Sequence, residues 1–163
     1  MNNIKRFDKT MFSDLIEEAE NSPRRRANLN IHQSYSDKVQ RLFIAMMPDS
    51  YVRPHRHVQE HKWEFFMVLE GALDLIFFDS KGVVTERISL CSNGYCQGVE
   101  IPPNVWHATV CNEPVVFMEV KQGPYEVIDD KGFADWAPQE GDADVPVFLA
   151  KLKQASTGDV VSV

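Results

Sequence analysis

The chain has 163 residues, of which 44% are hydrophobic and 25% are charged, a composition typical of one globular domain. Its 24 acidic and 17 basic side chains give a net charge of −7, so it has no general attraction for nucleic acid or for an anionic membrane. No apolar run approaches the roughly 20 residues of a membrane-spanning helix, and no secretion signal is visible at the start. Three cysteines, an odd number, favour a reducing compartment, so we expect a cytoplasmic protein.

The first predicted element is a short amphipathic helix. Its apolar residues recur at helical spacing: Phe12, Leu15, Ile16 and Ala19. Asp8 or Thr10 can cap its start, and Pro23 lies just beyond its end. The run of three arginines that follows, Arg24–Arg26, is interpreted as a solvated turn rather than an anion site, because the chain as a whole is acidic.

From Gln40 onward, the pattern changes to short runs rich in β-branched and aromatic residues, separated by turns rich in Pro, Gly and Asn. These runs predict strands at 40–47, 63–70, 73–78, 83–90, 99–101, 107–111 and 115–121. Regularly spaced strands without intervening helical patterns predict an all-β sandwich, jelly roll or barrel. Several strands are apolar on both faces, so we expect a second covering layer, and a homodimer is the default way to supply it.

After the last predicted strand, the chain becomes acidic and poor in strand-forming residues over 126–145. We expect an irregular C-terminal arm there, with a short apolar close at 147–152. The predicted organisation is therefore an N-terminal helix and linker (1–30), a β-barrel (31–125) and a C-terminal arm (126–163).

Four of the five histidines lie in or beside predicted strands. His55 and His57 are two residues apart, so on an extended strand both imidazoles point to the same side and can share one metal ion. Glu64 lies near the start of the next strand and faces back across the hairpin, and His107 begins a later strand. Three imidazoles and one carboxylate suit Fe, Mn, Ni, Co or Zn rather than Ca or Mg. The sequence thus predicts one divalent transition metal, and four protein ligands on an octahedral ion keep two positions for catalysis or ligand capture.

The context of these residues resembles the two signature motifs of the cupin superfamily. One motif is matched by Pro54-His55-Arg56-His57, followed by Glu64 and Gly71, and the other by Pro102–His107. The resemblance implies a double-stranded β-helix, the cupin jelly roll, with the metal inside one end of the barrel.

The spacing departs from the first motif. Six residues separate His57 from Glu64 where the motif has three or four, so the hairpin carries an insertion, residues 59–62, which contains His61. Three roles for His61 stay open: it replaces Glu64 as a ligand, it moves a proton in catalysis, or it faces water.

Further blocks resemble the WbuC family of cupin-fold metalloproteins over most of the chain, from about Asn30 to Pro138: 40–42, 50–57, 62–64, 77–79, 98–102, 106–107, 119–125 and 131–138. That family is associated with gene sets for bacterial surface polysaccharide, the O-antigen. The resemblance implies a small-molecule ligand, a sugar or nucleotide-sugar precursor. We expect a metal-dependent isomerase or epimerase, in which His61, or Glu64 if it binds no metal, moves the proton. The alternatives are a non-haem iron dioxygenase and a metal-bearing module that binds a sugar or a partner without catalysis.

Four further residues are candidates for substrate binding. Arg53 has the same strand parity as His55 and His57, so it can hold an anionic group, unless it is simply a surface arginine. Gln40 and Lys121 lie at strand ends and can reach the barrel mouth, although the favoured interpretation of Lys121 is an ion pair with Glu119 at the strand edge. Tyr125 belongs to a possible aromatic wall for a sugar, whose other members, more typical of a core, are Tyr51, Trp63 and Trp106.

A rival site uses the cysteines. Cys91, Cys96 and Cys111, together with His107, have spacings that can build a structural zinc site. That site conflicts with His107 serving the histidine pair and leaves His55 and His57 unexplained. The favoured interpretation is that the cysteines are small buried hydrophobic residues.

Overall fold

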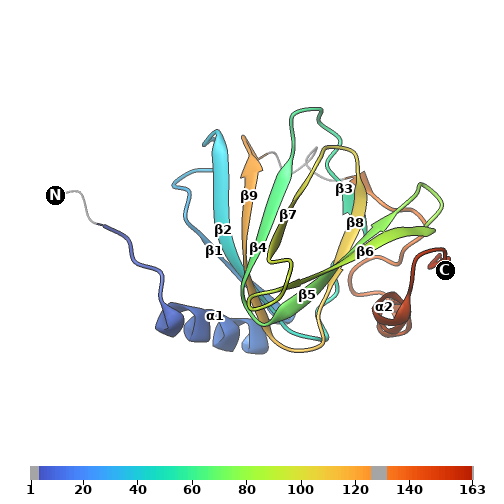
Figure 1. Cartoon of the computed structure of the whole chain (residues 1–163), viewed down its shortest axis with the longest axis horizontal. Coiled ribbons are helices and arrows are strands. Elements are labelled where there is room, and N and C mark those ends of the chain that lie inside the picture. The colour runs from blue at the N-terminus through green and yellow to red at the C-terminus, as the bar shows by residue number, and fades with distance from the viewer. Residues whose placement is uncertain (1–3, 126–131, 163) are drawn as a thin grey trace.

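Two five-stranded antiparallel sheets face each other in the structure, a computed structural model that describes residues 4–125 and 132–162 (Figure 1). Sheet A has the order β1 (Arg26–Asn30), β2 (Val39–Met46), β9 (Val115–Gln122), β4 (Glu64–Glu70), β7 (Gly98–Ile101). Sheet B has the order β10 (Gly132–Phe133), β3 (His55–Arg56), β8 (Trp106–Val110), β5 (Ala72–Phe78), β6 (Val84–Cys91). The expected all-β architecture of two sheets is confirmed.

All seven predicted strands are present, with ends shifted by a residue or two. Three further strands were not predicted: β1, β3 and β10. The strands β3 and β10 have two residues each, too few to show any periodicity. The strand β1 lies within the segment 1–30 expected to be helix and linker, and it pairs along its whole length with β2. Asn28 and Asn30 of β1 are poor strand formers, so a search for alternating apolar residues could not predict this strand.

The C-terminal segment differs from the irregular arm expected from its composition. Residues 126–131 lie outside the described residues, but beyond them the chain forms β10 and then a ten-residue helix, α2 (Val145–Gln154). Apolar side chains on one face of α2 are buried against sheet B: Phe148, Leu149 and Leu152. Arg87 of β6 donates hydrogen bonds to the carbonyls of Leu152, Lys153 and Ala155, which fixes the end of this helix.

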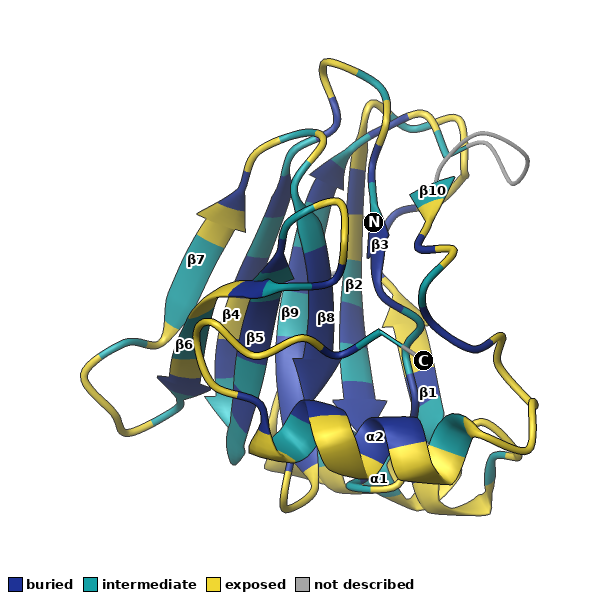
Figure 2. Ribbon diagram, turned by 90° about the vertical axis from the view of Figure 1, so that its right-hand side faces the viewer, coloured by how far each residue is buried: buried dark blue, intermediate teal, exposed yellow. Residues whose placement is uncertain are grey.

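Each sheet is covered on its outer face by one helix. The predicted N-terminal helix is α1 (Lys9–Asn21). The Asp8 side chain accepts a hydrogen bond from the Met11 N–H and so caps the start of α1. Leu15 of α1 packs on Phe43 beneath sheet A. Figure 2 shows α2 with one buried and one exposed face, the pattern of a helix laid against a sheet. Neither described helix is long and apolar enough to cross a membrane.

The two helices remove the reason for expecting a homodimer. The expectation rested on apolar strand faces that need a cover, and α1 and α2 supply that cover within one chain. The homodimer therefore stays a prediction, without the argument that first suggested it.

The turn that joins β4 to β5 depends on Gly71, which has a φ of +74°. A Cβ at this position would lie 2.5 Å from the carbonyl oxygen of Pro114, so Gly71→Ala adds a steric clash to an unfavourable backbone conformation. We expect it to lower the free energy of unfolding by about 2–4 kcal/mol, measured by urea denaturation. Gly141 is the matched control, because its φ is +96° and nothing lies within 4 Å of the added Cβ. Equal losses for Gly141→Ala and Gly71→Ala would show that the clash contributes nothing.

Candidate metal centre

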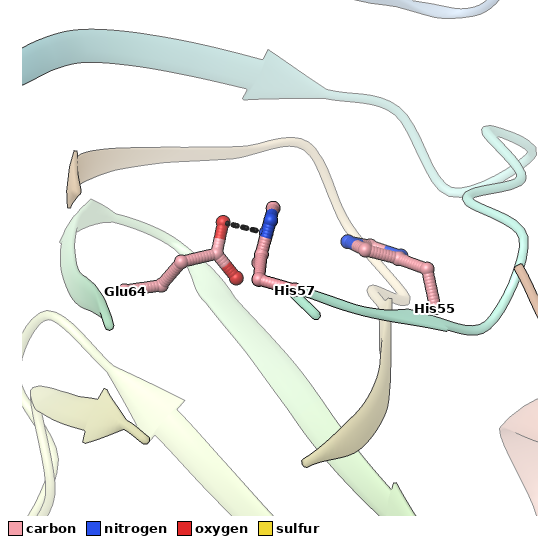
Figure 3. Close-up of side chains that lie close together, drawn as sticks. All are labelled: His55, His57 and Glu64. Carbon is pink, nitrogen blue, oxygen red and sulfur yellow. Dashed lines mark ion pairs between the residues drawn. The ribbon is translucent and has the colours of Figure 1, made fainter. Parts of the chain in front are cut away.

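Three buried side chains converge between the two sheets. His55 belongs to β3, His57 follows it directly, and Glu64 begins β4 on the opposite sheet (Figure 3). Their ligand atoms all lie within 4.8 Å of one another, and the distance from His57 Nε2 to Glu64 Oε1 is 2.8 Å. Among the residues that the structure describes, this is the group of His, Cys, Asp and Glu side chains arranged closely enough to hold a metal ion.

His107 lies at the edge of this cluster. It stands on β8 directly opposite His55 of β3, and the two imidazole ring centres are 4.5 Å apart. Its Nε2 is 3.1 Å from Glu64 Oε2, whereas its ring centre is 6.3 Å from that of His57. The structure thus brings all four predicted ligands to one place, with His107 close to His55 and Glu64 and farther from His57.

Hydrogen bonds to backbone carbonyls set the direction of two of the imidazoles. His55 Nδ1 lies 2.9 Å from the carbonyl oxygen of Arg53, and His107 Nδ1 lies 2.9 Å from that of Val105. A carbonyl oxygen only accepts, so each Nδ1 carries the proton and donates it. The Nε2 of each neutral ring is then unprotonated and carries a lone pair, and such a nitrogen can bind a metal ion.

This arrangement creates an electrostatic conflict that a cation would resolve. In the neutral ring, the Nε2 lone pair of His107 faces the carboxylate oxygen Oε2 of Glu64, and neither buried atom has an aligned hydrogen bond within the described part of the chain. Burial of such polar atoms is costly unless a proton or a cation lies between them. Nitrogen and carboxylate oxygen donors suit a divalent first-row transition ion, so the residues present fit the predicted metal.

The charge of Glu64 follows from the same contacts. Its burial acts to raise the pKa of the carboxyl, but the close contacts with the imidazoles of His107 and His57 outweigh burial and hold the pKa well below its usual range. Glu64 is therefore ionised and acts only as an acceptor, as a metal ligand must.

A cavity of about 170 Å³ opens beside the cluster, and we call it the metal cavity. His55, Glu64 and His107 line one part of it; its other lining residues are Arg24, Arg26, Ile44, Met46, Val52, Phe66, Thr109, Phe117 and Glu119. A groove of about 390 Å³ shares Arg24, Arg26, Ile44 and Glu119 with the metal cavity and runs along sheet A. The two spaces are thus neighbours that share these four lining residues.

Three of the predicted substrate-binding residues line this groove: Gln40, Lys121 and Tyr125. Gln40 of β2 pairs with Lys121 of β9, and Lys121 pairs in turn with Glu64 of β4. The ends of these three adjacent strands therefore lie side by side, which brings Gln40 and Lys121 close to the predicted metal ligand Glu64. The Gln40 amide, however, donates to the carbonyls of the loop that ends at Asp37, so it also holds that loop in place.

The other predicted residues lie further from the groove. Arg53 lines a neighbouring cavity of about 330 Å³ that also contains Arg24 and Arg26. His61 is exposed in the turn at 59–61 and lines none of the cavities described here, so its catalytic role stays a prediction. Tyr51 is buried in the core with its hydroxyl donating to the Pro138 carbonyl, and the Trp106 ring packs on Arg56.

The cysteines do not gather around His107. Cys96 Sγ lies 3.5 Å from the Gly98 carbonyl oxygen and Cys111 Sγ lies 3.6 Å from that of Met46. The close metal-binding group found in the described residues contains none of the cysteines, so the rival zinc site has no support.

Two elements of the site were not recognised in the sequence. The predicted ion pair between Lys121 and Glu119 is present at 2.9 Å, but the place of Glu119 in the site was missed: it is buried and lines both spaces. The inward parity of Phe117 and Lys121 on the same strand was the signal. The arginine run is also more than a solvated turn. Arg24 and Arg26 line the cavities, whereas Arg25 turns away and binds Asp49.

Comparisons with known proteins give the family and the fold of the chain. A family model described as a domain of unknown function, DUF6016, matches residues 7–90, more than half of the chain. The chain belongs to this family. No curated protein matches the chain.

Solved structures place the DUF6016 protein among double-sheet barrels. It is similar to an L-ribose isomerase from Cellulomonas parahominis (TM-score 0.55, 15% identity, 69% of this chain and 70% of that one). It is also similar to CapF (TM-score 0.56, 18% identity), over 69% of this chain but only 32% of that one. A cupin-2 domain protein from Shewanella frigidimarina aligns with a TM-score of 0.46 and 21% identity, over 60% of this chain and 80% of that one. The cupin jelly roll implied by the motifs is confirmed as the fold.

In the cavity of about 330 Å³ that also contains Arg53, Glu140 accepts hydrogen bonds from Arg24 and Arg26. These bonds lower the pKa of the Glu140 carboxyl to about 2, and the bonds from Arg24 contribute most. We expect a carbon-detected NMR titration of Glu140 to show this low pKa, and Arg24→Gln to move it back toward 4.5. Because the folded-state pKa is depressed, the stabilisation is complete above about pH 4.5 and is lost as the pH falls toward 2. Titration of wild-type Glu140 near 4.5 would contradict the contacts described.

Proposed function

We propose that this protein is a metal-dependent enzyme of the isomerase or epimerase type, acting on a sugar or a nucleotide-sugar precursor. The observation that carries the proposal is the buried cluster of His55, His57 and Glu64 beside a cavity that shares four lining residues with a polar groove. A purely structural cluster would have no need of an accessible space next to its ligand atoms.

The protein's own residues prepare the site for a cation. His55, His57, Glu64 and His107 would hold it, and the bonds from His55 Nδ1 and His107 Nδ1 to backbone carbonyls fix their rings. A bound divalent ion would supply a Lewis acid that stabilises negative charge developing on a substrate oxygen.

Isomerisation of a sugar also requires a group that moves a proton between neighbouring carbons. Glu119 is the residue best placed for this, because it lines both the metal cavity and the groove. Lys121 Nζ lies 2.9 Å from Glu119 Oε1 and 3.8 Å from Glu64 Oε1, so one ammonium group lies between the two carboxylates. Glu119 would accept a proton from one carbon and return it to the next, a role that exposed His61 is less well placed to fill.

The proposed role in surface-polysaccharide formation rests on family and fold resemblance rather than on the geometry of the site. The WbuC resemblance over about Asn30–Pro138 supports a role in the formation of bacterial surface polysaccharide such as O-antigen. The similar structure of an L-ribose isomerase supports the view that this fold accommodates sugar chemistry, although an identity of 15% speaks for the fold alone.

Metal binding is tested by His57→Ala, with His61→Ala as a control in the same hairpin. We expect the protein purified without chelator to contain about one transition-metal ion per chain, and His57→Ala to lower that content at least about tenfold, because a buried ligand is lost. His61→Ala should retain the metal, since His61 is exposed. Elemental analysis gives the metal content and circular dichroism verifies the fold. Full metal content in folded His57→Ala would refute the site.

Catalysis is tested by exchange of sugar C–H hydrogens in D₂O, followed by proton NMR with neutral, phosphorylated and nucleotide-linked sugars. We expect Glu119→Gln to slow exchange about 100-fold or more, because the proton acceptor is lost, while the metal content stays unchanged. Glu100→Gln, which alters an exposed carboxylate on β7, is the control. Oxygen uptake without exchange would instead support the iron dioxygenase alternative, and binding without turnover would support the non-enzymatic one.

A further inference from the structure

Two arginines at and just before the start of β1, both of which line the metal cavity, meet one glutamate from the C-terminal segment in the neighbouring cavity that contains Arg53. Arg24 Nε and one of its terminal nitrogens donate to the two oxygens of Glu140 at 2.7 and 2.8 Å, and Arg26 adds a third bond of 2.9 Å. The Glu140 carboxylate therefore sits in a fork of guanidinium donors, the geometry in which proteins bind carboxylate and phosphate ligands. We call Arg24 and Arg26 the arginine clamp.

The clamp has more positive charge than Glu140 neutralises. It carries two positive charges against one negative charge, and Arg53 lines the same 330 Å³ cavity as the clamp and Glu140. The Nε of Arg53 is buried and has no hydrogen-bond partner among the described residues, so a further donor is available there. In a chain with a net charge of −7, this local surplus of positive charge needs an explanation.

The position of the clamp ties it to the metal cavity. Arg24 and Arg26 line the metal cavity together with His55, Glu64 and His107, and they also line the polar groove. Arg26 is held in place by a bond to the Tyr51 carbonyl oxygen and its side chain is only 15% exposed, so its guanidinium is preorganised. Arg24, at 63% exposed, is free to follow a ligand.

The Glu140 carboxylate is placed so that another anion can displace it from the arginine clamp. Its side chain is 37% exposed and it lies in a stretch of turns before α2, outside any regular element. Gly141 follows it, and nothing lies within 4 Å of the position that a Cβ on Gly141 would take. The exposed side chain of Glu140 can therefore leave the arginines if another anion takes its place.

We propose that the arginine clamp binds an anionic group, a phosphate or a carboxylate, of a polyhydroxylated substrate, and that Glu140 occupies the clamp until this group displaces it. The inference rests on the proposed function for the identity of the substrate as a sugar, and it narrows that class to sugars that carry an anion. The clamp holds the anionic end while the polyhydroxylated part extends toward the metal ligands.

The test is calorimetric binding of glucose 6-phosphate, gluconate and neutral glucose to the full chain. We expect Arg24→Gln to weaken binding of the anionic probes about 10- to 100-fold, because a bidentate charged contact is lost. Glu140→Gln should strengthen their binding at least about fivefold, because the competing carboxylate is gone, and should leave glucose unaffected. The probe that responds more strongly identifies the anion as phosphate or carboxylate.

Arg25→Gln is the matched control, because Arg25 belongs to the same run but contacts Asp49 and the Glu20 carbonyl. It should change the affinity less than twofold. If Glu140 only anchors the C-terminal segment, Glu140→Gln will lower the melting temperature without strengthening anion binding, and the proposal is overturned. An equal response of glucose overturns it as well.

Failure of the metal proposal can be told apart from failure of this one. Inorganic phosphate binding that survives in His57→Ala protein and is lost in Arg24→Gln protein places the anion on the clamp, whatever the metal does. Phosphate binding that disappears together with the metal places the anion on the ion instead, which overturns the clamp and leaves the proposed function standing.

Discussion

The buried carboxylate of Glu64 is the group on which the rest of the site depends. A negative charge enclosed between two sheets is very unfavourable unless positive charge or strong donors surround it. His57 and His107 face it at 2.8 and 3.1 Å, and Lys121 lies 3.8 Å away. The imidazole of His107 donates through Nδ1 to a carbonyl, however, so its Nε2 offers a lone pair where the carboxylate needs a positive charge. A cation at this point satisfies every partner at once.

The strands around Glu64 divide their inner faces between packing and chemistry. On β9, Phe117 belongs to the core between the sheets, and the next two inward residues, Glu119 and Lys121, are polar and face the groove. On β8, His107 and Thr109 likewise line the metal cavity, while the outward Ala108 packs against the cluster that includes α2. Because the apolar end of each strand anchors the sheets, the polar end can hold charges that would otherwise destabilise the barrel.

Much of the fold and of the metal centre could be predicted from the sequence, and what could not be predicted has physical causes. The histidine pair and Glu64 could be predicted because a two-residue spacing on an extended strand and a following hairpin are local properties. The contact between Arg24 and Glu140 spans 116 residues and depends on how the C-terminal segment crosses the barrel, which no local pattern encodes. Arg26 begins a strand whose inner face is polar, so apolar alternation could not reveal it either.

The clamp also places stability and ligand binding in opposition. The three bonds to Glu140 fasten a segment that leads into α2, and α2 covers sheet B. An anion that takes the clamp removes those bonds and releases that segment, so part of its binding free energy is spent on the displacement. Selection for tighter anion binding would therefore favour a weaker hold on Glu140, and selection for stability would favour a stronger one. The partial exposure of Glu140 and Arg24 is what a compromise between these two demands would produce.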